Sequence, residues 1–111
     1  MLDHHNGRAV RSASSGLAQR CLAKARDHRA AGRSERARAS LSRVLGEEPN
    51  HPEAHYELGQ LLAATAPEKA ITHFVTALRG APEKPAHWIA LASALLAADR
   101  LPDARAILER Y

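Results

Sequence analysis

The stretch LGQLLAATAPEKAITHFVTALRGAP, residues 58–82, decides the fold. It holds two apolar stripes at helical spacing on either side of an Ala-Pro turn, with small residues at Gly59 and Ala70. The second stripe recurs along the chain. Ala37 precedes Ala70 by 33 residues (70 − 37), and Ala104 follows Ala70 by 34 (104 − 70). A fixed period of this length indicates stacked helical units, each too small to bury its apolar face alone.

Apolar residues repeat at helical spacing throughout these units, and no alternating strand pattern appears. The stripes of the first helices are His55, Leu58, Gly59 and Leu62, then Trp88, Leu91, Ala92 and Leu95. Those of the second helices are Leu41, Val44 and Leu45, then Ala70, Phe74, Ala77 and Leu78, then Ala104, Ile107 and Leu108. We expect these residues to form the core, with Gly59 opposite Ala70 at the closest approach of the two helices.

Capping residues and prolines set the expected helix boundaries. We expect a disordered leader over residues 1–16, because this segment is polar and aperiodic. The first helix is expected over 17–31, and Ser34 is the expected N-cap of the second, which ends near Gly46. Asn50 or His51 is expected to cap a third helix that runs to about Thr65. Four prolines fall in first-turn positions, where a missing N–H is tolerated, and open the last four helices: Pro52, Pro67, Pro85 and Pro102.

The pattern over about residues 18–111 resembles the tetratricopeptide repeat family, whose units run from an aromatic residue, Leu and Gly to Ala, Phe and Pro. Leu58, Gly59, Ala70, Phe74 and Pro82 carry the resemblance most fully. It implies an all-α solenoid of about three antiparallel helical hairpins in a right-handed superhelix, with atypical first and last repeats. The repeats would span 18–51, 52–84 and 85–111, within a repeat domain of 17–111.

The resemblance also implies a concave groove that binds a peptide or protein partner. The matching positions are Leu22, Arg26, Arg29, Tyr56, Glu57, Gln60, Ala63, Ile89, Ser93 and Leu96. The positions of a chaperone-binding carboxylate clamp show Leu22, Arg26, Glu57, Ala86 and Ala90, of which only Arg26 suits a carboxylate. Binding of the C-terminal carboxylate of a chaperone is therefore disfavoured.

Positive charge concentrates in the first part of the chain. Residues 1–45 carry ten Lys and Arg against three acidic residues, and residues 46–111 carry six against nine, which together give the net charge of +4. An acidic partner segment would suit this basic part. A nucleic-acid partner is disfavoured because the basic part holds no aromatic residues. If the chain did bind RNA through this part, the affinity would fall steeply as the salt concentration rises.

The chain shows no catalytic motif, so we expect a non-catalytic interaction scaffold with no cofactor and no metal site. His51 and His55 stand four residues apart, but zinc needs further ligands, and both are expected to be structural. Cys21 stands alone and is expected to be a small buried residue. No segment is long and apolar enough to span a membrane, and we expect a cytoplasmic protein.

Two alternatives concern the end of the repeat array. The last helix lacks a polar capping helix, which suggests self-association or partner docking through this end. The chain could instead be the substrate-docking N-terminal region of a larger glycosyltransferase, sulfotransferase or hydroxylase. Light scattering tests the first, and a reading frame that continues into a catalytic sequence would establish the second.

Overall fold

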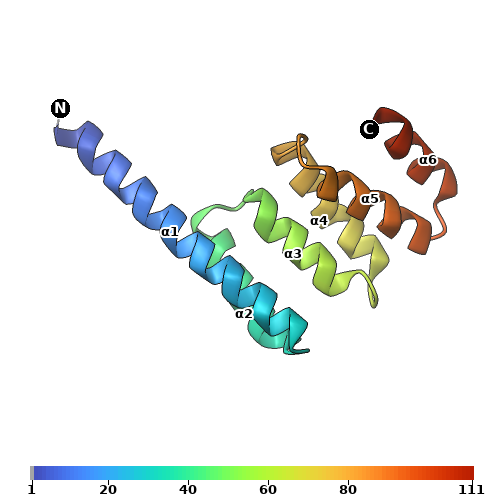
Figure 1. Ribbon diagram of the computed structural model, residues 1–111, viewed down its shortest axis with the longest axis horizontal. Coiled ribbons are helices and arrows are strands. Elements are labelled where there is room, and N and C mark those ends of the chain that lie inside the picture. Colours follow the sequence, from blue (N-terminus) through green and yellow to red (C-terminus); the bar gives the residue numbers. More distant parts are fainter. Residues whose placement is uncertain (1) are drawn as a thin grey trace. The chain divides into compact units, whose positions relative to one another are not determined.

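A computed structural model describes the backbone of residues 2–111 and the side chains of residues 16–111. Over this part the chain is all-α, as expected. The helices are α1 (Leu2–Ala30), α2 (Ser34–Glu47), α3 (Pro52–Leu62), α4 (Pro67–Gly80), α5 (Pro85–Ala97) and α6 (Leu101–Arg110) (Figure 1). They form two compact units, Met1–Pro49 and Asn50–Tyr111, which are described separately.

The expected boundaries need three corrections. Helix α1 is assigned from Leu2 rather than Leu17, and the predicted leader over residues 1–16 falls almost wholly outside the described side chains, so it stays a prediction. Ser34 is not an N-cap: it is already helical, and Arg33 takes the cap position without a side-chain bond. Helix α3 ends at Leu62 instead of Thr65.

In the first unit, α1 packs against α2 as a helical hairpin. Its core consists of small and aliphatic side chains: Ala18, Cys21, Leu22, Ala25, Ala37, Leu41 and Val44. Cys21 is a buried free thiol, as expected. Gly32 has a positive φ of 76° and lets the N–H of Arg33 bond to the carbonyl oxygen of His28 at 2.7 Å. A residue without a β-carbon suits this left-handed helix end.

In the second unit, α3 and α4 form a hairpin in which Gly59 lies against the ring of Phe74. A β-carbon at Gly59 would lie only 2.6 Å from Cδ1 of Phe74. Both Ala70 and Phe74 are buried. The small residue therefore makes room for a buried aromatic ring, and the expected Gly59–Ala70 contact stays a prediction.

Helix α5 packs on α4 and α6 packs on α5. One buried cluster joins them, made of Ala70, Ile71, Phe74, Ala90, Leu91, Ala94, Leu95 and Ala104. Not every residue of the expected stripes is buried. Leu58 and His55 are half-buried, because α3 buries Ala54, Glu57 and Gly59 instead. Leu108 is 52% exposed, because α6 has a helix neighbour only on its α5 side.

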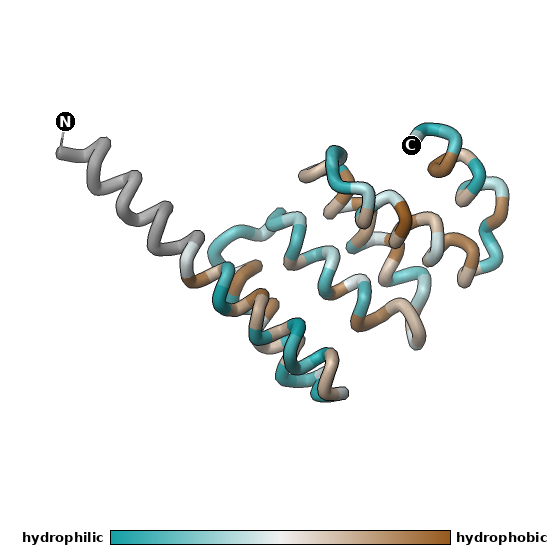
Figure 2. Tube along the Cα trace, viewed as in Figure 1, coloured by the Kyte–Doolittle hydropathy of each residue, from teal (hydrophilic) through white to brown (hydrophobic). Residues whose placement is uncertain are grey.

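Helices α3 to α6 begin at or next to a proline, as the sequence predicted. Proline opens each of the helices α3 to α6 in its first turn. The side chain of His51 caps α3, because its Nδ1 accepts the N–H of Ala54 at 3.2 Å. Hydrophobic and hydrophilic residues mix along every described helix in Figure 2, as expected of helices that bury one face.

Candidate functional site

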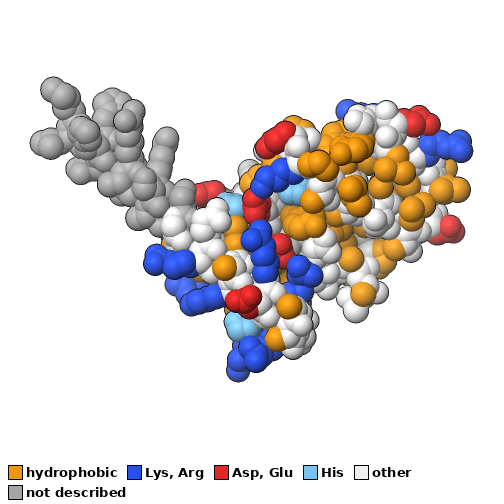
Figure 3. All heavy atoms as spheres, viewed as in Figure 1, with side chains coloured by type: hydrophobic (Ala, Val, Ile, Leu, Met, Phe, Trp, Pro, Cys, Tyr) orange, Lys and Arg blue, Asp and Glu red, His pale blue; other side chains and the backbone are white. Residues whose placement is uncertain are grey.

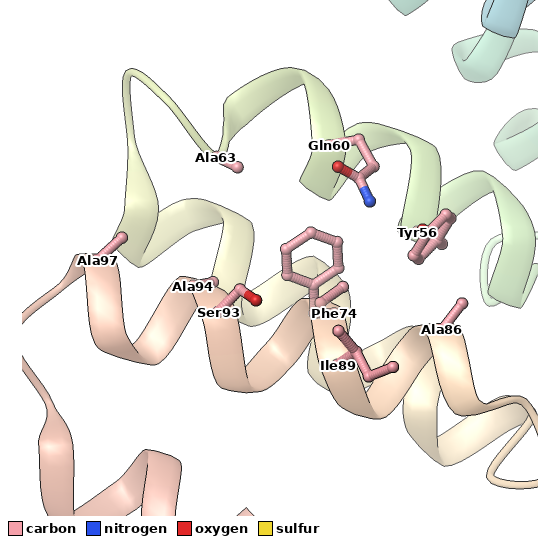
Figure 4. Close-up of a pocket in the computed structure, with 10 residues that line it drawn as sticks. Tyr56, Gln60, Ala63, Phe74, Ala86, Ile89, Ser93, Ala94 and Ala97 are labelled. Carbon is pink, nitrogen blue, oxygen red and sulfur yellow. The ribbon is translucent and has the colours of Figure 1, made fainter.

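A pocket of about 370 Å³ lies between α3 and α5 in the second unit. Helix α3 contributes one wall, helix α5 the other, and Phe74 of α4 lies between them (Figure 4). The lining residues are Tyr56, Gln60, Ala63, Phe74, Ala86, Ile89, Ala90, Ser93, Ala94 and Ala97. The pocket is therefore formed by facing sides of two helices, with an aromatic ring at the base.

The alanines of α5 keep this space open. Ala86, Ala90, Ala94 and Ala97 recur every three or four residues and line the pocket with side chains of one carbon. Larger residues at these positions would fill the space that separates the two walls. The sequence pattern thus produces a shallow groove rather than a closed helix–helix contact.

The aromatic wall is held in place by ring contacts. The ring of Tyr56 lies 5.9 Å from the ring of Phe74 and 5.1 Å from that of His87. His87 is itself buried, and its Nδ1 donates to the carbonyl oxygen of Ala81 at 3.3 Å. Because each partner is fixed in the core, Tyr56 is positioned before any ligand arrives.

The lining combines apolar side chains with two uncharged polar ones. Ile89 is 56% exposed and offers an apolar contact, while Gln60 and Ser93 offer an amide and a hydroxyl group. No charged side chain is among the lining residues. This arrangement can bury apolar side chains of an extended segment while the two polar groups bond to its backbone.

The structure brings together five of the groove residues that the resemblance implied: Tyr56, Gln60, Ala63, Ile89 and Ser93. Leu22 is fully buried on α1 and is not part of an open lining. Leu96 is exposed but lines a different pocket with Leu101 and Leu108. Glu57 is only 3% exposed, so it is not part of the open lining. Arg26 and Arg29 are exposed on α1 of the first unit. Figure 3 shows Lys and Arg side chains gathered over this unit, and hydrophobic side chains over the second.

Phe74, Ala86 and Ala97 line the pocket, although the sequence did not predict them as part of the groove. Phe74 was assigned to the core, which is correct for most of its surface, but one part of the ring is also the base of the groove. Ala86 and Ala97 were not assigned to an open groove wall. Their spacing with Ala90 and Ala94 along one face of α5 was the signal that could have identified them.

A histidine pair between α3 and α4 was also missed. Nδ1 of His55 and Nδ1 of His73 lie 3.0 Å apart, so one ring donates to the other. The rings are stacked at 5.3 Å. Burial, and then the charge of His55, lower the pKa of His73 below its usual value. A shared hydrogen bond of this kind holds one proton, so double protonation would break it.

Two further findings concern the described part of the chain. No group of three or more His, Cys, Asp or Glu side chains in it is placed to hold a metal ion. None of its helices combines the length and the apolar character that crossing a membrane requires.

Comparison with protein families matches the tetratricopeptide repeat over residues 22–66 and again over residues 61–111. Neither the curated proteins nor the solved structures contain a match. The two family matches together span both hairpins of the second unit and most of the first. They agree with the repeated helical hairpins. The chain belongs to the tetratricopeptide repeat family.

Proposed function

We propose that this protein is a non-catalytic interaction module that binds an extended peptide segment of a protein partner in the α3–α5 groove. The observation that carries the proposal is the open, uncharged lining of Tyr56, Gln60, Ile89 and Ser93. Repeats of this family suggest a protein-interaction scaffold in general terms. The groove adds the expected chemistry of the bound segment: uncharged, with at least one apolar side chain.

The walls support specific roles for individual residues. The exposed face of Ile89 and the ring of Tyr56 would bury an apolar side chain between them. Gln60 and Ser93 stand on opposite walls (Figure 4), where an extended backbone could bond to both. An acidic stretch elsewhere in the partner would suit Arg26 and Arg29 on α1 of the first unit, and this part of the proposal is independent of the groove.

A displayed peptide library selected on the folded protein tests the groove. Binding of the selected consensus peptide is then measured by calorimetry for the wild type and for Ile89→Asp. We expect the charged variant to weaken binding roughly tenfold or more, as truncation of a buried anchor does. Leu101→Asp is the matched control, because Leu101 is a 63% exposed apolar residue outside this groove. Equal loss in both variants, or none in Ile89→Asp, would place the peptide elsewhere.

Self-association through α6 is a separate proposal. It is supported by exposed apolar side chains around one pocket of about 340 Å³, contributed by Leu96, Leu101 and Leu108. Light scattering over a concentration series tests it. A wild type that dimerises while Leu108→Glu stays monomeric would support it, and a wild type that remains monomeric throughout would refute it.

A further inference from the structure

A second pocket, of about 410 Å³, lies between α4, α5 and α6 and shares no residue with the α3–α5 groove. Its lining residues are Val75, Leu78, Arg79, Pro82, Trp88, Leu91, Ile107 and Arg110. Trp88 and Leu91 are three residues apart, on a different face of α5 from Ile89 and Ser93. The two faces of one helix therefore contribute to two separate cavities.

The floor of this second pocket is aliphatic. Leu91 is buried, and Val75, Leu78 and Ile107 are half-buried members of the same packed region. A cavity of this size and lining lies within the range of small-molecule sites. Its apolar surface would bind a hydrocarbon group through the hydrophobic effect.

The tryptophan wall is fixed in position. Nε1 of Trp88 donates to the carbonyl oxygen of Pro82 at 2.7 Å, and the indole lies 6.0 Å from the ring of Tyr111. Because its N–H is already bonded to Pro82, the indole presents an apolar surface to the pocket rather than a donor. A ligand would therefore need to find its polar partners elsewhere.

Two arginines provide those partners. Arg79 and Arg110 come from the last turns of α4 and α6 and both line the pocket. Neither forms an ion pair with another side chain in the described part of the chain. No acidic residue is among the lining residues. Favourable interaction with the helix dipoles explains their positions in the last turns, but it leaves both guanidinium groups able to bind an anion.

An aliphatic cavity bordered by two guanidinium groups and no carboxylate selects a particular ligand chemistry. A cationic amphiphile would be repelled, and a small polar dianion would leave the floor unfilled. We propose that this pocket binds a small amphipathic monocarboxylate, with its hydrocarbon chain on the floor and its carboxylate between Arg79 and Arg110. This proposal does not depend on peptide binding in the α3–α5 groove.

Titration with octanoate, and with 1-octanol as the matched uncharged probe, tests the proposal. Trp88 is the only tryptophan of the chain, so its emission reports the pocket directly. We expect saturable octanoate binding with a dissociation constant of roughly 1 mM, and octanol binding weaker by roughly threefold to fivefold. Calorimetry provides a second readout that does not rely on a change in emission.

The double variant Arg79→Gln and Arg110→Gln should bind the two probes equally, because only the charge-dependent preference is removed. Arg105→Gln is the matched control: Arg105 lies on α6 but lines a different pocket, so its variant should keep the preference. Ile89→Asp should also bind octanoate as the wild type does. Equal binding of both probes by the wild type, a preference that survives the double variant, or no saturable binding would overturn the proposal.

Discussion

Replacement of Gly59 by alanine should destabilise the second unit, although alanine favours helices. A β-carbon at this position would lie 2.6 Å from Cδ1 and 2.7 Å from Cζ of Phe74. Carbon atoms in contact prefer a separation of about 3.5–4.0 Å, so the overlap is close to 1 Å. Phe74 is 1% exposed and belongs to the packed cluster, and part of its ring borders the α3–α5 groove, so the ring must shift against its packed neighbours or toward that groove.

The expected magnitude follows from two opposing effects. Overpacking of a rigid core lowers the free energy of unfolding by about 1–3 kcal/mol, and the large overlap with a buried ring favours a value near 3. The higher helix propensity of alanine raises the free energy of unfolding by about 1 kcal/mol and so offsets part of this loss. The net loss should be about 2 kcal/mol, which lowers the urea midpoint by about 1 M.

Urea unfolding followed by Trp88 fluorescence measures this change, because the only tryptophan lies in the second unit. Gly46→Ala is the matched control. Gly46 is also helical, but no atom lies within 4 Å of the added β-carbon, so a gain of about 0.5 kcal/mol is expected by circular dichroism. Phe74→Leu should relieve part of the overlap when combined with Gly59→Ala. A Gly59→Ala protein as stable as the wild type would refute the reasoning.

Three further predictions concern other elements of the fold. Leu91→Ala should lower the free energy of unfolding by about 2–5 kcal/mol because Leu91 is buried in the joint core of α4, α5 and α6; an unchanged melting temperature would contradict the packing. Asp99→Gly should raise that free energy by about 0.5–1 kcal/mol in urea unfolding, because Asp99 has a positive φ of 59° at the end of α5. The lowered pKa of His73 means that the unfolded chain binds the proton more tightly. Stability should therefore fall as the pH drops from about 7.5 through the unfolded value of about 6.5, and His73→Asn should show a smaller fall.

The sequence was sufficient for the helices and for their pairing in the second unit. Proline at the first turn is a local signal, because it depends only on the missing N–H and the fixed φ of that residue. The small residues at Gly59 and Ala70 were also identified, since a 33-residue period makes them stand out. First-turn proline acts on the residues beside it, and the repeat period is visible in the sequence itself. Both features can therefore be predicted from the sequence pattern alone.

The contact at Gly59 shows where pattern alone was insufficient. Spacing places Gly59 on the face of α3 that meets α4, but it does not fix the axial offset between the helices. That offset decides which side chains of α4 face the glycine, and the ring of Phe74 is one that does. The same uncertainty affected Leu108, whose stripe position is apolar but whose exposure depends on which helices surround α6.

The residues of the candidate groove were predicted only in part. The family resemblance implies Tyr56, Gln60, Ile89 and Ser93 as groove positions, and all four line the pocket, while their role in binding stays a prediction. The burial of Glu57, beside Tyr56, was not found. The pairing of His55 with His73 joins residues 18 apart in the chain and depends on side-chain rotamers, for which the sequence holds no periodic signal.

Binding of the partner in the α3–α5 groove can be mapped residue by residue. An amide chemical-shift map of the isotope-labelled protein, titrated with the peptide selected from the display library, tests it most directly. We expect the largest shifts at Tyr56, Gln60, Ile89 and Ser93, and little change at Arg79 and Arg110. A map that centres on α4 and α6 while these four amides stay unchanged would contradict it.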